Sequence, residues 1–352
     1  MKRDLRLLLG FCVVASLGLI MTGCNSSETT SNANGSTESS TDKPKVAYVT
    51  NGVASFWVIA ESGVKQGGED FDADTQVLMP AEGISDQKRM IEDLITKGID
   101  GIAVSPIDPV NQTDLLNQAS KYTKLITHDS DAPDSDRLCY IGMDNYIAGR
   151  MCGELVREAM PDGGKLAIFI GRLEQDNAKR RRQGVIDAIL GRSEDPSRYD
   201  LPDAEIKEGP WHIVGTYTDQ FDRAQGKANA EDALSRHPDL GGMVGLFAYN
   251  PPLMLEALKQ ANKLNDVKVI AFDEADETLQ GIIDGHVHGT VVQNPYEYGR
   301  QSVRVLAGLA RGESLADLGI PEDGFLNISA NQIRSDNVET FWAELKKNLG
   351  EQ

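Results

Sequence analysis

The stretch from Ile99 to His128 reads IDGIAVSPIDPVNQTDLLNQASKYTKLITH and contains a complete strand–helix–strand unit. Its two ends, IDGIAVS and KLITH, are short apolar runs of the length of a strand, and residues 109–121 between them are predicted to be helical. Near-continuous apolar strands joined through a helix are typical of a parallel sheet that helices cover on both faces. This unit therefore predicts an α/β fold.

The same alternation recurs on both sides of this unit. Further strands are expected at 45–51, 75–79, 137–144, 165–171, 241–247, 267–273, 286–293 and 324–330. Further helices are expected at 54–70, 84–97, 145–160, 176–190, 222–236, 251–262, 275–284, 295–311 and 337–348, and an irregular, proline-containing stretch at 191–212. Since 352 residues exceed what one compact core usually takes, these two runs of strand–helix units predict two doubly wound, Rossmann-like parallel-sheet lobes.

The composition is that of an ordinary globular protein, with 40% hydrophobic and 25% charged residues. The formal net charge of −19 argues against a nucleic-acid partner, because binding to phosphates requires a positive face. The run AKRRR at 178–182 is locally basic, in contrast to the negative net charge of the whole chain. We expect it to be a solvated helix face from which only Arg181 turns inward.

The N-terminus has the features of an exported lipoprotein. Three basic residues precede the apolar run 7–21, which is short for a membrane span and fits a signal peptide. The following MTGC resembles the lipobox of bacterial lipoproteins, so residues 1–23 are predicted to be a lipoprotein signal peptide and Cys24 the lipidated residue. Residues 24–44 are expected to be a flexible tether, because this Ser/Thr/Asn-rich segment lacks apolar periodicity. The alternative is an ordinary signal peptide followed by an unrelated cysteine.

Polar side chains stand where the predicted strands end, which is where open parallel sheets bind their ligands. Asp accepts hydrogen bonds, whereas Asn and Gln both donate and accept them, and nearby aromatic rings offer flat apolar faces. This mixture suits a neutral polyol, above all a sugar. The strand-end residues are Asn51, Ser105, Asp129, Asp131, Asn250, Asp273 and Gln293, with Phe56 and Trp57 opening the first helix.

Several separated stretches, taken together and in this order, resemble the periplasmic ribose- and galactose-type sugar-binding proteins, whose core is shared with lac-repressor-type regulators. The resemblance covers nearly all of residues 45–330. It is carried by YVTNGVASFW, IDGIAVSPIDP, ITHDSDAP, YIGMDNYIAGR, AKRRRQGVIDAI, FDRAQGKANAEDAL, LFAYN, VIAFDEADE and TVVQNPYEYGRQSV.

The resemblance implies a set of sugar contacts from both lobes. Hydrogen-bonding roles fall on Asn51, Asp129, Arg181, Asn250, Asp273 and Gln293, and stacking roles on Phe56, Trp57 and Phe221. The chain departs from the ribose branch at Ser130, where that branch has an arginine. Asp131 resembles instead the Asp-Ser-Asp of rhamnose- and autoinducer-2-type binders, and it is expected to bind the ligand as well.

The resemblance also implies a periplasmic binding protein of type I, with three hinge crossings near Asp144, near Gln293-Asn294 and near Phe325–Asn327. The N-terminal lobe would be 45–143 plus 294–325, and the C-terminal lobe 144–293 plus 326–352. The lobes would close on a monosaccharide, such as a ribose-like pentose or a related hexose, and the closed form would be recognised by the permease of an ABC-type importer. The place of action would be the periplasm or another extracytoplasmic face, with the lipid on Cys24 as the membrane anchor.

Other interpretations remain open from the sequence alone. The same closed form could report a sugar or an autoinducer-2-like signal to a sensor kinase or chemoreceptor. A transcription regulator would need a DNA-binding segment in place of the N-terminal signal. A hydrolase could use Asp129 and Asp273 as its carboxylate pair, but no catalytic signature was found, and neither an enzyme activity nor a cofactor is expected.

Two pairs of residues, Cys139 with Cys152 and His286 with His288, raise the question of a disulfide and of a metal site. Cys139 and Cys152 could form a disulfide outside the cytoplasm, which only their geometry can decide. His286 and His288 alternate on a predicted strand and could point to one face, but two ligands are too few for a metal site. No metal is therefore expected.

Overall fold

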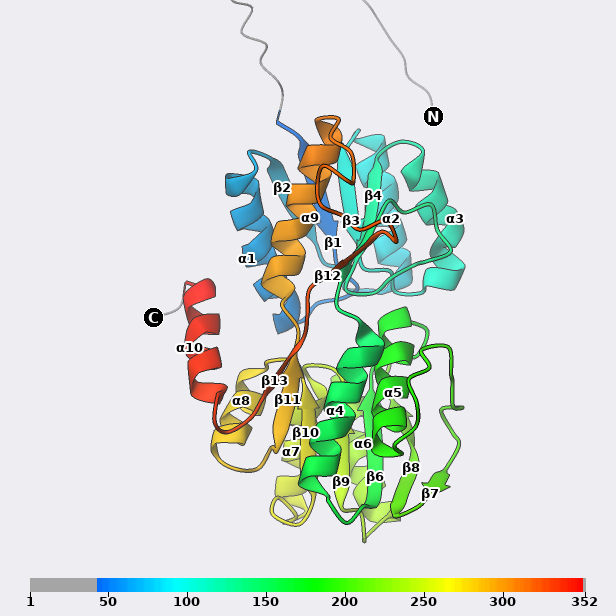
Figure 1. The fold of residues 1–352 in the computed structure, drawn as a ribbon, viewed down its shortest axis with the longest axis vertical. Coiled ribbons are helices and arrows are strands. Elements are labelled where there is room, and N and C mark those ends of the chain that lie inside the picture. The colour runs from blue at the N-terminus through cyan, green and yellow to red at the C-terminus, as the bar shows by residue number, and fades with distance from the viewer. Residues whose placement is uncertain (1–42, 351–352) are drawn as a thin grey trace, which may run out of the picture. The chain divides into compact units, whose positions relative to one another are not determined.

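The computed structural model describes residues 43–350, and these form two α/β lobes (Figure 1). The predicted signal peptide, the lipidation site Cys24 and the tether up to residue 42 lie outside the described residues. Within the described part of the chain, none of the helices has the length and apolar character that a membrane crossing requires.

The N-terminal lobe is built on a six-stranded parallel sheet with the order β12-β5-β4-β3-β1-β2. Its strands are β1 (Lys45–Val49), β2 (Asp74–Leu78), β3 (Gly101–Val104), β4 (Lys124–His128), β5 (Tyr140–Gly142) and β12 (Phe325–Asn327).

Helices cover both faces of this sheet, as its apolar strands predict. Val46 and Tyr48 of β1 belong to the core under α1 (Ser55–Asp70) and α9 (Pro295–Ala310). Ala47 and Val49, which alternate with them, belong to the core under α2 (Ile84–Thr96) and α3 (Pro109–Ser120). Because successive strand residues point to opposite faces, both sets of side chains are buried and the strand has no polar face.

The C-terminal lobe contains a seven-stranded sheet with the order β13-β11-β10-β9-β6-β8-β7. The edge strands β13 and β7 are antiparallel to their neighbours, and the other pairs are parallel. The strands are β6 (Gly164–Ile170), β7 (Ile206–Glu208), β8 (Trp211–Thr218), β9 (Gly242–Gly245), β10 (Lys268–Phe272), β11 (Gly289–Val292) and β13 (Asn331–Ile333).

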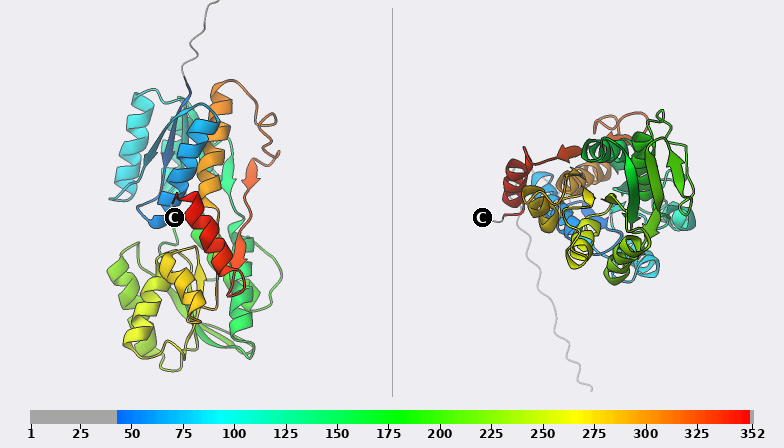
Figure 2. Two further views of the ribbon diagram at one scale, coloured as in Figure 1. Left: turned by 90° about the vertical axis from the view of Figure 1, so that its left-hand side faces the viewer. Right: turned by 90° about the horizontal axis from the view of Figure 1, so that it is seen from below.

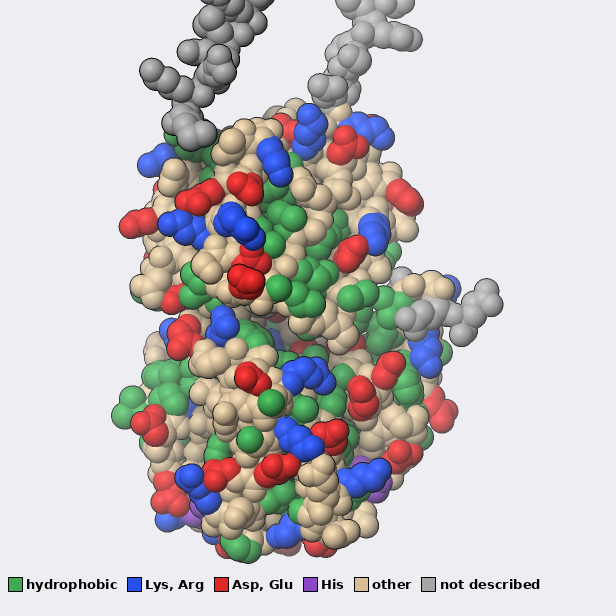
Figure 3. Space-filling model, turned by 180° about the vertical axis from the view of Figure 1, so that it is seen from behind, with side chains coloured by type: hydrophobic (Ala, Val, Ile, Leu, Met, Phe, Trp, Pro, Cys, Tyr) green, Lys and Arg blue, Asp and Glu red, His purple; other side chains and the backbone are tan. Residues whose placement is uncertain are grey.

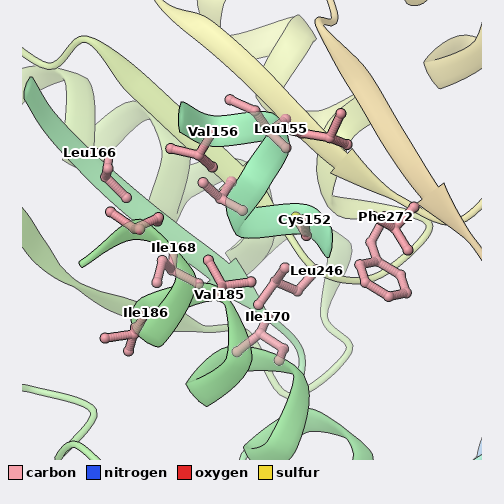
Figure 4. Packing of buried hydrophobic residues seen from close by; sticks show 14 of the residues in the cluster. Cys152, Leu155, Val156, Leu166, Ile168, Ile170, Val185, Ile186, Leu246 and Phe272 are labelled. Carbon is pink, nitrogen blue, oxygen red and sulfur yellow. The ribbon is translucent and has the colours of Figure 1, made fainter. Parts of the chain in front are cut away.

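Six helices pack on the faces of this second sheet or beside it (Figure 2). Leu166, Ile168 and Ile170 of β6 face the core formed with α4 and α5, which Figure 4 shows at close range. The intervening residues of β6 belong to the opposite core with α6, α7 and α8, against which α10 is also packed. The helices are α4 (Asn145–Ala159), α5 (Asp176–Ile189), α6 (Arg223–Arg236), α7 (Asn250–Gln260), α8 (Asp276–Ile283) and, at the end of the chain, α10 (Val338–Asn348).

The chain passes between the two sheets three times. The crossings lie between β5 and α4, between β11 and α9, and between β12 and β13. All three lie near the positions that the sequence predicts. The third requires one correction of the predicted lobe boundary, because all of β12 pairs with β5 of the first sheet, and the crossing therefore follows Asn327.

The structure differs from the predicted elements in three places. The stretch 191–212, expected to be irregular, contains β7 and the beginning of β8. The apolar pattern of β8 is interrupted by Gly215, and its pairing with β6 shifts register, so the usual alternation is broken. The strand expected at 324–330 is shortened to β12, which ends at Asn327, and a separate strand, β13, begins at Asn331. The strand expected at 286–293 begins only at Gly289.

Candidate functional site

A cavity of about 890 Å³ lies between the two lobes and is lined by residues of both. Figure 3 shows the hollow between the upper and lower halves of the space-filling view. The lining comes from the beginning of α1, the first turns of α5, α10, and the segments that follow β2, β4, β6, β8, β9, β10 and β11. The cavity thus lies where the carboxyl ends of parallel strands meet, as expected for this fold class.

Asp129 is the most highly coordinated side chain on the N-lobe wall. Its Oδ2 accepts hydrogen bonds from Ser105 Oγ at 2.9 Å, Asn51 Nδ2 at 3.3 Å and Asn177 Nδ2 at 3.1 Å. Its Oδ1 accepts no hydrogen bond from the described residues. One oxygen is therefore committed to the protein, while the other is left for a ligand.

The backbone and the burial of Asp129 both set its chemistry. Asp129 has a left-handed φ of 57°, which turns the chain sharply at the end of β4. Burial raises the pKa of Asp129 to about 6, and the Arg181 guanidinium and the hydrogen bond from Ser105 oppose this rise. A hydroxyl donor in the cavity would favour the ionised form of this carboxyl.

The C-lobe wall carries a second acidic residue and a buried cation. Asp273 follows β10, also with a left-handed φ, of 67°, and its Oδ1 accepts a hydrogen bond from Gln293 Nε2 at 2.8 Å. Burial raises the pKa of Asp273, and Arg181 opposes the rise. Arg181 is 1% exposed and donates to Leu246 O and to Asn145 Oδ1. Three of its five N–H groups are used in this way, so two remain for a ligand.

Aromatic rings line both sides of the cavity. On the N-lobe side Phe56 and Trp57 meet edge to face with their centroids 4.7 Å apart. On the C-lobe side Phe221 stacks on Phe247 at 5.5 Å, with the two planes 4° apart. A flat ligand with hydroxyls at its edge and C–H groups on its faces fits between such walls.

The structure brings eight of the ten sequence-predicted ligand residues to this cavity. They are Asn51, Phe56, Trp57, Asp129, Arg181, Phe221, Asp273 and Gln293. They come from separated parts of the chain that the parallel topology brings together.

Asp131 and Asn250 are not among the lining residues. Both oxygens of Asp131 accept from Arg137, at 2.5 and 2.6 Å, and Thr127 Oγ1 donates to it at 2.6 Å. Asn250 Nδ2 donates to Asp219 at 3.1 Å, and its Oδ1 accepts from the Phe247 backbone N–H. These hydrogen bonds join both side chains to other residues of the protein.

Sequence reasoning missed several polar and aromatic lining residues of the C-lobe. Asn177 opens α5 after the end of β6, and the strand-end rule that selected the others would have found it. Its Oδ1 has no hydrogen-bond partner among the described residues. Arg172, Phe247, Tyr249 and Glu274 also line the cavity.

His128 and Ser130 flank Asp129 but do not line the cavity. The His128 ring stacks on Tyr48 with centroids 3.8 Å apart, and the residue is fully buried. Burial lowers the pKa of His128 to about 3, so the ring is neutral at ordinary pH. His128 therefore acts as a packing residue and not as a proton-transfer partner of Asp129.

The cysteine and histidine alternatives are also decided by geometry. Cys139 and Cys152 are free, and they lie in the cores of different lobes, so they form no disulfide. His286 and His288 precede β11 and therefore do not alternate on a strand. Residues 43–350 contain no group of three or more side chains that could hold a metal ion.

The chain was compared with known proteins. The family model described as "Periplasmic binding protein domain" matches residues 46–314. The ribose import binding protein of Salmonella typhimurium strain LT2 is 23% identical over 265 residues, which cover 74% of this chain and 82% of that protein. The D-ribose/D-allose-binding protein of Pseudomonas aeruginosa PAO1 is 24% identical over 267 residues, which cover 72% and 77% respectively.

Solved structures show the same fold. The solute-binding protein of an ABC transporter from Burkholderia graminis C4D1M, in complex with D-arabinose, superposes with a TM-score of 0.74. It is 26% identical in sequence, and the match covers 84% of this chain and 96% of that one.

Proposed function

Because this chain belongs to the periplasmic binding protein family, we propose that it binds a monosaccharide in the cavity between its lobes and closes on it. The family is one of binding proteins and not of enzymes. The carboxyl groups of Asp129 and Asp273 are accordingly assigned to hydroxyl recognition and not to hydrolysis.

One observation carries this proposal. Asp129 from one lobe and Asp273 with Arg181 from the other line a single cavity between aromatic walls. Carboxylates and a guanidinium supply acceptors and donors for ring hydroxyls, and the rings supply apolar faces for C–H groups. A ligand that contacts both walls would stabilise the closed arrangement of the lobes, since its contacts are complete only there.

The ligand class follows from this chemistry and from the relatives. The names of similar proteins give ribose, allose and D-arabinose as ligands. A ribose-like pentose or a related hexose is therefore the proposed ligand. The proposed partner is the permease of an ABC-type importer, and the proposed location is an extracytoplasmic membrane face, to which a lipid on Cys24 would attach the protein.

The test is titration calorimetry of the purified protein against a panel of pentoses and hexoses. At least one sugar should bind, and Asp129→Ala should weaken its binding by about a hundredfold or more, because a charge-assisted acceptor is lost from a buried site. Asp134→Ala is the matched control: it makes the same change at an exposed acid of the following loop that does not line the cavity, and binding should stay within about twofold of wild type. If no sugar in the panel binds, a monosaccharide is excluded as the ligand.

A further inference from the structure

Glu274 is an acidic cavity residue that none of the interactions above explains. It follows Asp273 directly, lines the cavity and is only 6% exposed. Neither of its carboxyl oxygens has a hydrogen-bond partner among the described residues. The preceding acid differs in this respect, since Asp273 accepts from Gln293.

Burying a carboxyl group without hydrogen-bond partners costs free energy, so the two unpartnered oxygens of Glu274 require a physical reason. Within residues 43–350 no lysine, arginine or histidine lies within ion-pair distance of Glu274. The charged group that acts on Glu274 is the Asp273 carboxylate, which repels a second negative charge. Burial first, and then Asp273, raise the pKa of Glu274 well above its usual range. The side chain is therefore held as a neutral acid, which has one O–H donor and one carbonyl acceptor.

We propose that Glu274 is a ligand-contacting residue that, as a neutral carboxylic acid, donates a hydrogen bond to an oxygen of the bound sugar and so helps to select the sugar. This inference rests on the proposed function. It adds a donor to a site in which Asp129 and Asp273 supply acceptors. A hydroxyl or ring oxygen at this point of the ligand would satisfy the unpartnered group, whereas a deoxy position would leave it unsatisfied.

The surroundings of Glu274 determine the sign of its pH dependence. The titratable and charged groups that line the same cavity or act on its immediate neighbours are Asp273, Asp276, Glu277, Tyr249, Tyr298, Arg181, Asp129, Arg172, Arg223 and Lys346. A neutral Glu274 donates, but an ionised one cannot. Affinity should therefore decrease as the pH rises through the raised pKa of this group, in the direction opposite to the effect of Asp129.

The test compares Glu274→Gln with Glu274→Leu, using the best sugar of the panel and calorimetry across the pH range. Gln keeps a neutral donor of the same shape. The sugar affinity of Glu274→Gln should therefore stay within about threefold of wild type and should no longer decrease as the pH rises. Leu removes the donor, and its affinity should fall by about tenfold to a hundredfold. Melting temperature and far-ultraviolet circular dichroism establish that each variant is folded.

Glu256→Gln is the matched control, because it makes the same Glu-to-Gln change at an exposed position on α7 outside the cavity. It should keep both the affinity and the alkaline decrease of the wild type. Wild-type affinity in Glu274→Leu would overturn the inference, as would equal losses in the Gln and Leu variants. Preferential binding of an amino sugar that Glu274→Gln abolishes would also overturn it, since an ionised carboxylate would then pair with an amine. If the wild type binds no sugar at all, the proposed function itself fails.

Discussion

Asp129 shows how one residue can connect both lobes and still face a ligand. Its Oδ2 accepts from Asn51 and Ser105 of the N-lobe and from Asn177 of α5 in the C-lobe. These three donors hold the carboxyl in one orientation. Because the donors converge on one oxygen, the orientation of the other oxygen is also fixed before the ligand arrives, which reduces the entropy lost on binding.

The raised pKa of Asp129 leads to a prediction about binding. A sugar hydroxyl that donates to this residue binds the ionised form, so affinity should decrease as the pH falls below about 6, approaching tenfold per pH unit. Calorimetry in two buffers of different ionisation enthalpy should also detect proton release on binding near this pH. An affinity that stays constant between pH 7 and pH 4.5 would contradict the assignment.

The Asp129 carboxyl gives the stability of the ligand-free protein a pH dependence opposite in sign to that of sugar binding. Its folded-state pKa of about 6 lies above the unfolded-state value of about 3.9. The folded protein therefore holds this proton more tightly. The resulting stabilisation is complete below the unfolded-state pKa and is lost as the pH rises through about 6.

At the scale of elements, close helix contacts position the site. In the C-lobe, α4 and α5 approach each other closely at two glycines, which have no side chain to keep the helices apart. A Cβ on Gly149 would lie 2.1 Å from the backbone oxygen of Arg181, and a Cβ on Gly184 would lie 2.1 Å from the backbone oxygen of Tyr146. In the N-lobe, a Cβ on Gly63 of α1 would lie 1.8 Å from the backbone oxygen of Tyr296 in α9. Each lobe thus has a helix pair whose spacing depends on glycine.

This geometry predicts that Gly149→Ala will damage both stability and binding. The added methyl group must push α5 away from α4, and α5 carries Asn177 and Arg181. Overpacking of this kind costs about 1–3 kcal/mol or more. We expect a melting temperature lower by several degrees, as measured by calorimetry, and a sugar affinity weaker by about tenfold.

Gly241→Ala is the matched control for this substitution. Its Cβ would meet the terminal methyl group of Met160 at 3.2 Å, and this flexible side chain can move aside. Sugar affinity should be unchanged in this variant. If Gly149→Ala melted and bound sugar like Gly241→Ala, the helix contact would not be what positions α5.

At the scale of the whole described unit, each lobe has hydrophobic cores of its own, and three crossings join the lobes. Cys139 lies in an N-lobe core and Cys152 in a C-lobe core. No covalent link between these two residues restrains the lobes, so the three crossings and non-covalent contacts such as the hydrogen bond from Asn177 to Asp129 relate one lobe to the other.

The two thiols give a prediction at this scale. Burial raises the pKa of both Cys139 and Cys152 to about 12, so neither thiol is a reactive thiolate in the folded protein. A reductant should leave the melting temperature unchanged within about 1 °C, because there is no disulfide between them to remove. Alkylation followed by mass spectrometry should modify these two residues only in denaturant, and rapid modification in the native state would contradict their burial.

Most strands and helices follow from local sequence patterns, and the exceptions have local causes. The predicted series of strands and helices reproduces the two α/β lobes. The missed strand β8 contains Gly215 and a register shift, which hide its alternation. The segment 324–330 reads as one strand, but its pairing with the first sheet ends at Asn327, and the chain joins the second sheet only from Asn331.

The sequence by itself determined the α/β class, the two-lobe organisation and the strand ends at which ligand residues stand, because side-chain periodicity and strand order are properties of neighbouring residues. Only the tertiary structure decided which polar groups at those ends face the cavity. Asp131 turns to Arg137 and Asn250 to Asp219, whereas Asn177 and Glu274 line the cavity without having been predicted. The physical reason is that a polar side chain points to whichever partner best satisfies it, and that partner is set by folding, not by the side chain's position along the chain.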